Sequence, residues 1–271
     1  MIHNKKILRH LSHTEYEHEF DRKALNALEN TPGLSAVGRF ITKHTVEKFF
    51  KVQYTGSNLK VTKETYPHIY EYLEYACQIL DLSVPELYIQ WGYSINACTI
   101  GAEKPIIVLN SGLIDLCSDD EILFIIGHEC GHIKSNHMLY HLMAQVINFI
   151  IDQVPFGQYA GAAVKYALLY WDRMSEFTAD RAGLLCCQNM KAAARVFMKI
   201  AGLPTNQYAH IDEKSFVKQA QDFDNLDYDK MSKFIKMLSV MDNNHPWTVL
   251  RTSQLINWVQ TGEVQQIMST H

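Results

Sequence analysis

The sequence lacks features that mark several common classes of protein. Its 25 Lys and Arg are outnumbered by 29 Asp and Glu, giving a net charge of −4, so no nucleic-acid-binding surface is expected. Residues 1–10 contain no apolar run of the kind found in secretory signal peptides, so none is predicted. The six cysteines include no C-x-x-C pair, and Cys186 and Cys187 are adjacent, which is a poor disulfide framework. We therefore expect a reducing, cytoplasmic location.

Long uninterrupted apolar runs are also absent. A membrane-spanning helix needs roughly 20 predominantly apolar residues. The most apolar stretch, residues 142–170, is broken by residues that are charged or disrupt helices: Asp152, Pro155, Gly157 and Lys165. The sequence therefore predicts two buried helices of a bundle here, and membrane association is not favoured.

What is present is enough apolar material for a sizeable core: 47% of the 271 residues are hydrophobic. Apolar residues recur at helical spacing over residues 66–80. Short strands are predicted at residues 59–61, 87–91, 97–100 and 105–109. The pattern favours an α+β fold, mainly α, with a small and mostly antiparallel sheet.

The central motif is His128-Glu129-Cys130-Gly131-His132, which has the form HExxH. On a helix, the i and i+4 positions place both imidazoles on one face, one turn apart, where they can share a metal ion. Glu129 lies about 100° further round the helix. That position suits a general base acting on a water next to the metal.

Local signals support a helix through this motif. Ser118 and Glu121 form a capping box, and the acidic first turn suits the helix dipole. Gly127 and Gly131 each cost roughly 1 kcal/mol relative to Ala in a helix. Two such glycines beside the histidines predict the close approach of another backbone or of a substrate.

HExxH alone is a weak signal, because a buried helix with hydrogen-bonded histidines would look the same. A catalytic zinc site needs a third protein ligand. The extended form HExxHxxGxxH is not met, since Ser135 and Met138 occupy its Gly and third His positions. The remaining candidates are the three glutamates that follow the motif: Glu176, Glu213 and Glu263.

Among these, Glu176 stands in the most informative context, E-F-T-A-D, with Asp180 one helical turn later. A ligand Glu followed by such an Asp supplies both a metal ligand and a carboxylate that can accept the second N–H of a ligand histidine. An ordinary Glu/Asp pair on a solvated helix face is the alternative.

HExxH, then E-x-x-A-D, then His245-Pro246 and Arg251 resemble the zinc metallopeptidases that include the CAAX prenyl proteases and the HtpX heat-shock protease. The resemblance covers roughly residues 60 to 260. It implies a gluzincin-type fold, with one zinc ion (Zn2+) per chain bound by His128, His132 and Glu176. It further implies Glu129 as the general base and Asp180 as the partner of a ligand histidine.

The resemblance also suggests substrate-binding residues. The family's Asn-Ala followed by an apolar strand is matched by Asn96, Ala97, Cys98 and Thr99, which implies an edge strand that pairs with an extended peptide. The family's H-P-P reads His-Pro-Trp at 245–247, so the local loop shape departs from the pattern.

Two residues near the end of this region have expected roles. His245 is a candidate hydrogen-bond donor to the oxyanion of the reaction; the alternative is a histidine that caps a loop before a proline. Arg251 is expected to orient a carboxylate near the site rather than to touch substrate.

The combined prediction is a zinc-dependent endopeptidase acting on peptides or proteins, with a helical extension at 1–60 and a metallopeptidase domain at 61–271. Sites with two histidines and one glutamate also accept other divalent ions. A non-catalytic zinc protein remains the alternative, with Cys130 as a conceivable fourth ligand, although the i+2 position points away from His128. A latent enzyme covered by its N-terminal arm or by 205–240 is another alternative.

Overall fold

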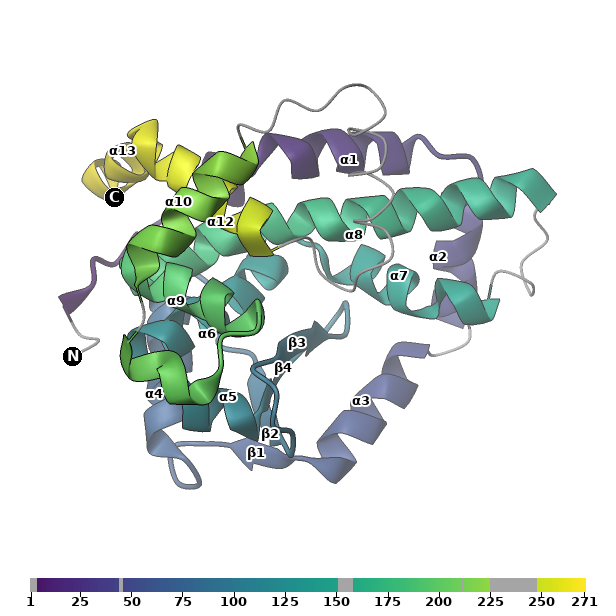
Figure 1. Cartoon of the computed structure of the whole chain (residues 1–271). Coiled ribbons are helices and arrows are strands. Elements are labelled where there is room, and N and C mark those ends of the chain that lie inside the picture. The colour runs from purple at the N-terminus through teal and green to yellow at the C-terminus, as the bar shows by residue number, and fades with distance from the viewer. Residues whose placement is uncertain (1–3, 44–45, 151–157, 211, 225–247) are drawn as a thin grey trace.

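The computed structural model describes residues 4–43, 46–150, 158–210, 212–224 and 248–271. Helices dominate, and a small sheet lies to one side of them (Figure 1). The long helix α8 crosses the molecule with α1 beside it.

The described elements follow one another in this order. The first part contains η2 (His13–Glu15), α1 (Glu19–Glu29), α2 (Leu34–Lys43), α3 (Val46–Ser57), β1 (Leu59–Val61), α4 (Pro67–Ile79), β2 (Glu86–Gln90), β3 (Ala97–Ile100), β4 (Ile106–Asn110) and α5 (Ser111–Leu116). The second part contains α6 (Asp119–Lys134), α7 (Met138–Ile150), α8 (Gln158–Cys187), α9 (Met190–Ile200), η3 (Thr205–His210), α10 (Glu213–Asp224), α12 (Thr248–Gln260) and α13 (Glu263–Thr270).

The four strands form one sheet in the order β1-β2-β4-β3. The β1–β2 and β3–β4 pairs are antiparallel, and the β2–β4 pair is parallel. Every residue of β4 is buried, as expected for a central apolar strand covered on both faces. The predicted α+β class, mainly α with a mostly antiparallel sheet, is confirmed, and β3 is an edge strand of this sheet.

Helices α6 and α8 pack against each other unusually closely, because small residues line their contact. A Cβ atom added at Gly131 would lie 2.5 Å from the Cβ of Ala182, and one at Gly127 would lie 2.5 Å from the Cβ of Cys186. The predicted close approach at the two glycines is therefore confirmed, and the approaching partner is helix α8.

Helix α8 contributes to two apolar cores. The larger is built from α4, β2, β4, α6, the C-terminal half of α8, α9 and α12. The second is built from α1, α2, α7 and the N-terminal half of α8. The segment before residue 61 contributes to both, through Leu8 and Leu11 in the first and Leu28 in the second. The division of the chain at residue 60 stays a prediction.

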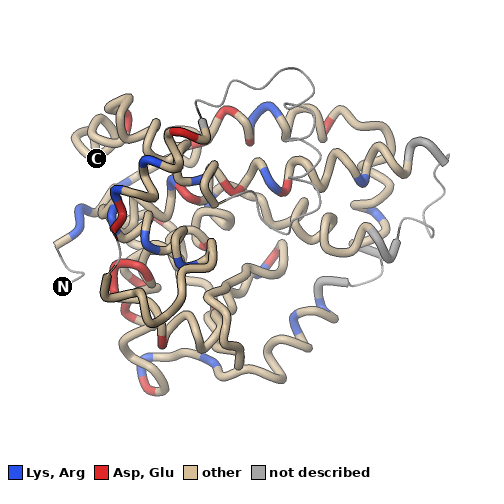
Figure 2. The backbone as a smooth tube through the Cα atoms, in the orientation of Figure 1, with Lys and Arg blue, Asp and Glu red and all other residues tan. Residues whose placement is uncertain are grey.

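The apolar stretch after the motif forms α7 and the first half of α8. The later part of this stretch, up to residue 170, and Glu176 therefore lie on one continuous helix of 30 residues. Within the described residues, no helix combines the length and apolarity that a membrane span requires. Charged residues of both signs are interspersed along α1 and α8 (Figure 2).

Candidate metal centre

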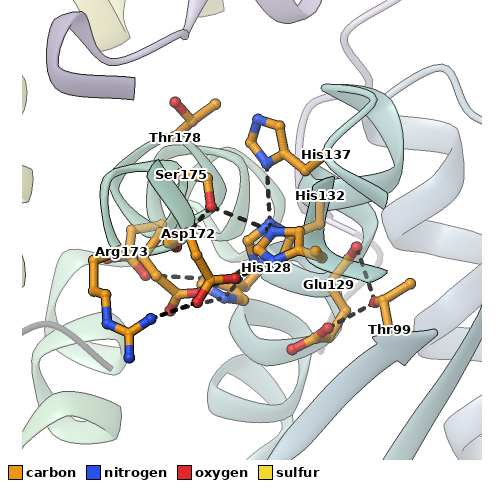
Figure 3. A network of polar contacts seen from close by, with 12 residues as sticks. Thr99, His128, Glu129, His132, His137, Asp172, Arg173, Ser175 and Thr178 are labelled. Carbon is orange, nitrogen blue, oxygen red and sulfur yellow. Dashed lines mark hydrogen bonds and ion pairs between the residues drawn. The ribbon is translucent and has the colours of Figure 1, made fainter. Parts of the chain in front are cut away.

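Three side chains from α6 and α8 converge in the interior: His128, His132 and Glu176. Figure 3 shows the two histidines of this group. His128 and His132 point their Nε2 atoms toward each other at 3.2 Å. Glu176 places Oε1 3.4 Å from Nε2 of His132 and Oε2 3.7 Å from Nε2 of His128. All three residues are buried.

The local sequence explains how these groups meet. The backbone N–H of Ser118 donates to Glu121 Oε2 at 2.6 Å, which fixes the start of α6, and Lys199 Nζ lies 2.9 Å from the same oxygen. Because Gly131 faces Ala182 without a side chain of its own, α8 approaches α6 closely enough to bring Glu176 opposite the two imidazoles.

The remote nitrogens of both imidazoles have hydrogen-bond partners. Nδ1 of His128 lies 3.0 Å from Oδ1 of Asp180. Asp180 is ion-paired with Arg251, and an ionised carboxylate can only accept, so this nitrogen carries the proton. Nδ1 of His132 lies 3.0 Å from Nδ1 of His137 and 3.2 Å from Nε2 of His141.

This donor set fits a bound cation. With protons on the Nδ1 atoms, two nitrogen lone pairs and a carboxylate converge without a hydrogen atom between them. The 3.4 and 3.7 Å distances to Glu176 also exceed ordinary N–H···O hydrogen bonds. Burial lowers the pKa of His132 well below its usual value, which favours the neutral ring. Burial also acts to lower the pKa of His128, but the nearby carboxylates of Asp180 and Glu176 raise it. Two imidazoles and one carboxylate are typical ligands of a catalytic zinc site with an open position.

Arg251 of α12 contacts two carboxylates of the cluster, those of Asp180 and Glu176. Its Nε donates to Asp180 Oδ2 at 2.7 Å, its Nη2 donates to Oδ1 at 2.5 Å, and its Nη1 lies 3.0 Å from Glu176 Oε2. Burial would lower the pKa of Arg251, but the two carboxylates outweigh it and raise that pKa. The guanidinium thus compensates the negative charge of both carboxylates.

Glu129 lies next to the cluster and is held by the sheet. Thr99, on β3, donates from Oγ1 to Glu129 Oε2 at 2.7 Å (Figure 3). Asn96, just before β3, and Ala97, its first residue, line a cavity of about 90 Å³ that His128 and Glu129 also line. The walls of this cavity away from the polar groups are apolar: Leu113, Phe124, Ile125, Val196, Phe197 and Ile200.

The other residues singled out in the sequence lie elsewhere. Cys98 faces the small apolar cluster on the opposite side of the sheet from the cavity, and burial raises its pKa to about 12. Cys130 lies in the larger core, with its Sγ 3.9 Å from Cys77 Sγ. His245 lies outside the described residues.

Sequence reasoning missed the residues behind His132. His137 and His141 follow His132 at five and nine positions, and this spacing is the signal that could have indicated them. Their carboxylate partners, Asp21 and Asp172, come from α1 and α8, and nothing in the local sequence marks them.

Comparison with known proteins agrees with this architecture. The model of Peptidase family M48 matches residues 83–271, and the chain belongs to this family. The predicted resemblance is thereby confirmed, and membership implies a metallopeptidase that acts on proteins.

Relatives carry corresponding names. The chain is 28% identical over 265 residues to the plastoglobule-localized metallopeptidase 48, chloroplastic, of Arabidopsis thaliana, covering 97% of this chain and 77% of that protein. It is 25% identical over 138 residues to the protease HtpX of Xylella fastidiosa, covering 39% and 48%. A protease HtpX homolog of Sulfurovum is 33% identical over 97 residues, which is 35% of each chain. No solved structure matched.

Proposed function

We propose that this chain is a zinc-dependent endopeptidase whose metal is held by His128, His132 and Glu176. The observation that carries the proposal is the convergence of two imidazole lone pairs and a carboxylate beside a further glutamate, Glu129. Within the described residues the cluster offers three protein donors, the number typical of catalytic rather than structural zinc sites.

Glu129 is assigned the role of general base. When bound, zinc supplies Lewis-acid chemistry, polarising the scissile carbonyl and lowering the pKa of water. Glu129 accepts a proton from the water as its oxygen bonds to the carbonyl carbon. It then delivers that proton to the leaving nitrogen as the C–N bond breaks. The hydrogen bond from Thr99 fixes the direction in which the Glu129 carboxylate points.

The substrate is expected to bind in an extended conformation. Among the described strands, none pairs with the outer edge of β3, and Asn96 and Ala97 lie at the cavity beside Glu129. A peptide strand that pairs with this edge would run past the metal site. The role of His245 as a donor to the oxyanion stays a prediction.

A reducing location is also proposed. All six cysteines are free thiols, which supports the cytoplasmic location expected from the sequence. The name of the Arabidopsis relative places that protein in the chloroplast.

The test is zinc content measured together with casein cleavage, in wild type, Glu129→Gln and Glu176→Ala. We expect about one zinc per chain and cleavage in wild type, zinc without cleavage in Glu129→Gln, and loss of zinc in Glu176→Ala. Cleavage retained by Glu129→Gln would exclude this glutamate as the base. Zinc without cleavage in wild type would favour the latent or non-catalytic alternative.

A further inference from the structure

Two histidines stand behind the ligand His132, on the side away from Glu176. His137 is buried and is the last residue before α7, and His141 lies one turn into α7. One nitrogen of each faces Nδ1 of His132, at 3.0 Å for His137 and 3.2 Å for His141. Figure 3 shows His137 directly against His132.

The far nitrogen of each of these histidines meets a carboxylate. Asp21 Oδ2 lies 3.1 Å from His137 Nε2, and Asp172 Oδ1 lies 2.6 Å from His141 Nδ1. Asp172 also pairs with Arg173 at 2.7 Å.

Asp21 accepts two more hydrogen bonds, from Trp171 Nε1 at 3.0 Å and Thr178 Oγ1 at 2.6 Å. Burial alone would raise the pKa of Asp21, but the hydrogen bonds from His137 and its neighbours lower it. Asp21 is therefore an ionised acceptor, and the facing nitrogen Nε2 of His137 carries the proton.

These proton positions determine the state of His132. A neutral imidazole has one N–H and one lone pair, so His137, with its proton at Nε2, presents the lone pair of Nδ1 to His132. Nε2 of His141 also lies 3.3 Å from Ser175 Oγ, which donates its proton to the backbone oxygen of Asp172 and therefore accepts from His141. The lone pair of His137 that faces Nδ1 of His132 requires a proton at that atom. The lone pair of His132 is then at Nε2, where it faces His128 and Glu176.

We propose that His137 is a positioning residue that holds His132 in the tautomer able to bind metal, and that Asp21 acts through His137. The inference rests on the proposed metal site and adds to it a residue of α1, Asp21, which contacts His137. The backbone N–H of His18, the N-cap of α1, also donates to Thr178 Oγ1 at 3.0 Å, so α1 is fixed to α8 at the same point. Docking of the N-terminal segment thereby supports metal affinity.

The test is the zinc dissociation constant of the full chain, measured by competition with a chromophoric chelator. His137→Leu removes both hydrogen bonds, and we expect the dissociation constant to rise about 10- to 100-fold. His137→Gln can still accept from His132 and donate to Asp21, so it should recover most of the affinity. His68→Leu, at an exposed histidine of α4, is the matched control and should bind zinc like wild type.

The role of Asp21 is tested by a double-mutant cycle. If Asp21 acts through His137, Asp21→Ala should weaken zinc binding, and adding it to His137→Leu should cause little further loss. If the losses of zinc affinity in the two single variants add fully in the double variant, the two residues act separately, and Asp21 does not act through His137. Thermal unfolding of each metal-free variant checks that the chain is folded before zinc is added.

The outcomes separate this inference from the proposed function. Wild type that binds no zinc would refute the metal site itself. Wild type that binds zinc, with His137→Leu equal to it in affinity and only less stable, would leave the metal site intact and refute the positioning role. Two zinc ions per wild-type chain at saturation, falling to one in His137→Leu, would show that His132, His137 and His141 bind a second ion. That result would overturn the proposal that His137 acts by holding the proton of His132 at Nδ1.

Discussion

Arg251 and Asp180 form a buried ion pair with two parallel hydrogen bonds, of 2.7 Å from Nε and 2.5 Å from Nη2. The residues are 71 positions apart in the sequence. The remaining terminal nitrogen of Arg251 lies 3.0 Å from Glu176, so a single guanidinium joins helix α12 to two carboxylates of α8.

Removing that guanidinium should destabilise the protein strongly. Arg251→Met would leave Asp180 and Glu176 without their buried cation, at an expected cost of about 3–5 kcal/mol in the free energy of unfolding. Arg251→Lys keeps the charge but cannot form two parallel bonds, so its loss should be smaller. Urea unfolding in the presence of EDTA measures both. A Met variant as stable as wild type would contradict the stabilising role of the pair.

The glycines between α6 and α8 give a second prediction. Gly131→Ala adds a Cβ only 2.5 Å from the Cβ of Ala182, so the helices must move apart. We expect a loss of about 1–3 kcal/mol, despite the better helix propensity of Ala. Gly56→Ala on α3 is the matched control, because a Cβ there has no neighbour within 4 Å, and it should be neutral or stabilising. Thermal unfolding distinguishes the two variants.

Thr99 should affect the rate of cleavage and not the binding of zinc. Thr99→Val removes the hydrogen bond to Glu129 while keeping the shape of the side chain. A lost hydrogen bond of about 1–1.5 kcal/mol corresponds to roughly a tenfold lower kcat. Thr99→Ser should retain most of the rate. Equal kcat in the Val variant and wild type would show that Glu129 does not depend on this contact.

Acid should weaken the docking of α1 through His18. Nδ1 of this buried histidine accepts from the Phe20 N–H at 3.1 Å, and burial first, then nearby Arg181, lower its pKa to about 4. Its unfolded value is about 6.5, so the unfolded state binds more protons between these two values. Stability from this group is complete above pH 6.5 and falls as the pH drops toward 4, by about 2 kcal/mol at pH 5.

The comparison for His18 is His18→Asn, which can still cap α1 but does not titrate. Urea unfolding at pH 7 and pH 5 should show a smaller difference between the two pH values in this variant than in wild type. The same difference in both proteins would assign the acid sensitivity to other groups.

Metal removal should lower the melting temperature. An ion that binds only the folded state stabilises it by about 2.7 kcal/mol when its free concentration is 100 times the dissociation constant. For a chain of this size we expect EDTA to lower Tm by roughly 5–10 °C. Glu176→Ala, with one ligand removed, should show little change on EDTA addition. A large EDTA effect in that variant would place the metal elsewhere.

The elements that could be predicted from sequence are those specified by neighbouring residues. The capping pair Ser118 and Glu121 indicates the start of α6, and the spacing of His128 and His132 follows from helical periodicity. Predicted strands agree with observed ones to within about a residue, because apolar runs bounded by turns mark them locally.

Contacts between distant segments could not be predicted in this way. Local patterns do not specify that β2 pairs in parallel with β4, or that Ala160 and Glu176 lie on one continuous helix. The contact between Asp21 and His137 joins segments whose own sequences look like an ordinary helix face and a loop. Such carboxylate partners become visible only when tertiary packing brings α1 against α8.

The order in which the site residues occur along the chain limits when the site can form during synthesis. Asp21 is made early, the histidines of α6 near the middle, and Arg251 only after more than two hundred further residues have followed Asp21. Until α12 has been synthesised and has docked, Asp180 and Glu176 lack their guanidinium. A ribosome-bound chain ending before residue 251 therefore lacks the cation that pairs with Asp180 and Glu176, and we expect the proposed metal site to reach its final arrangement only after α12 has been made.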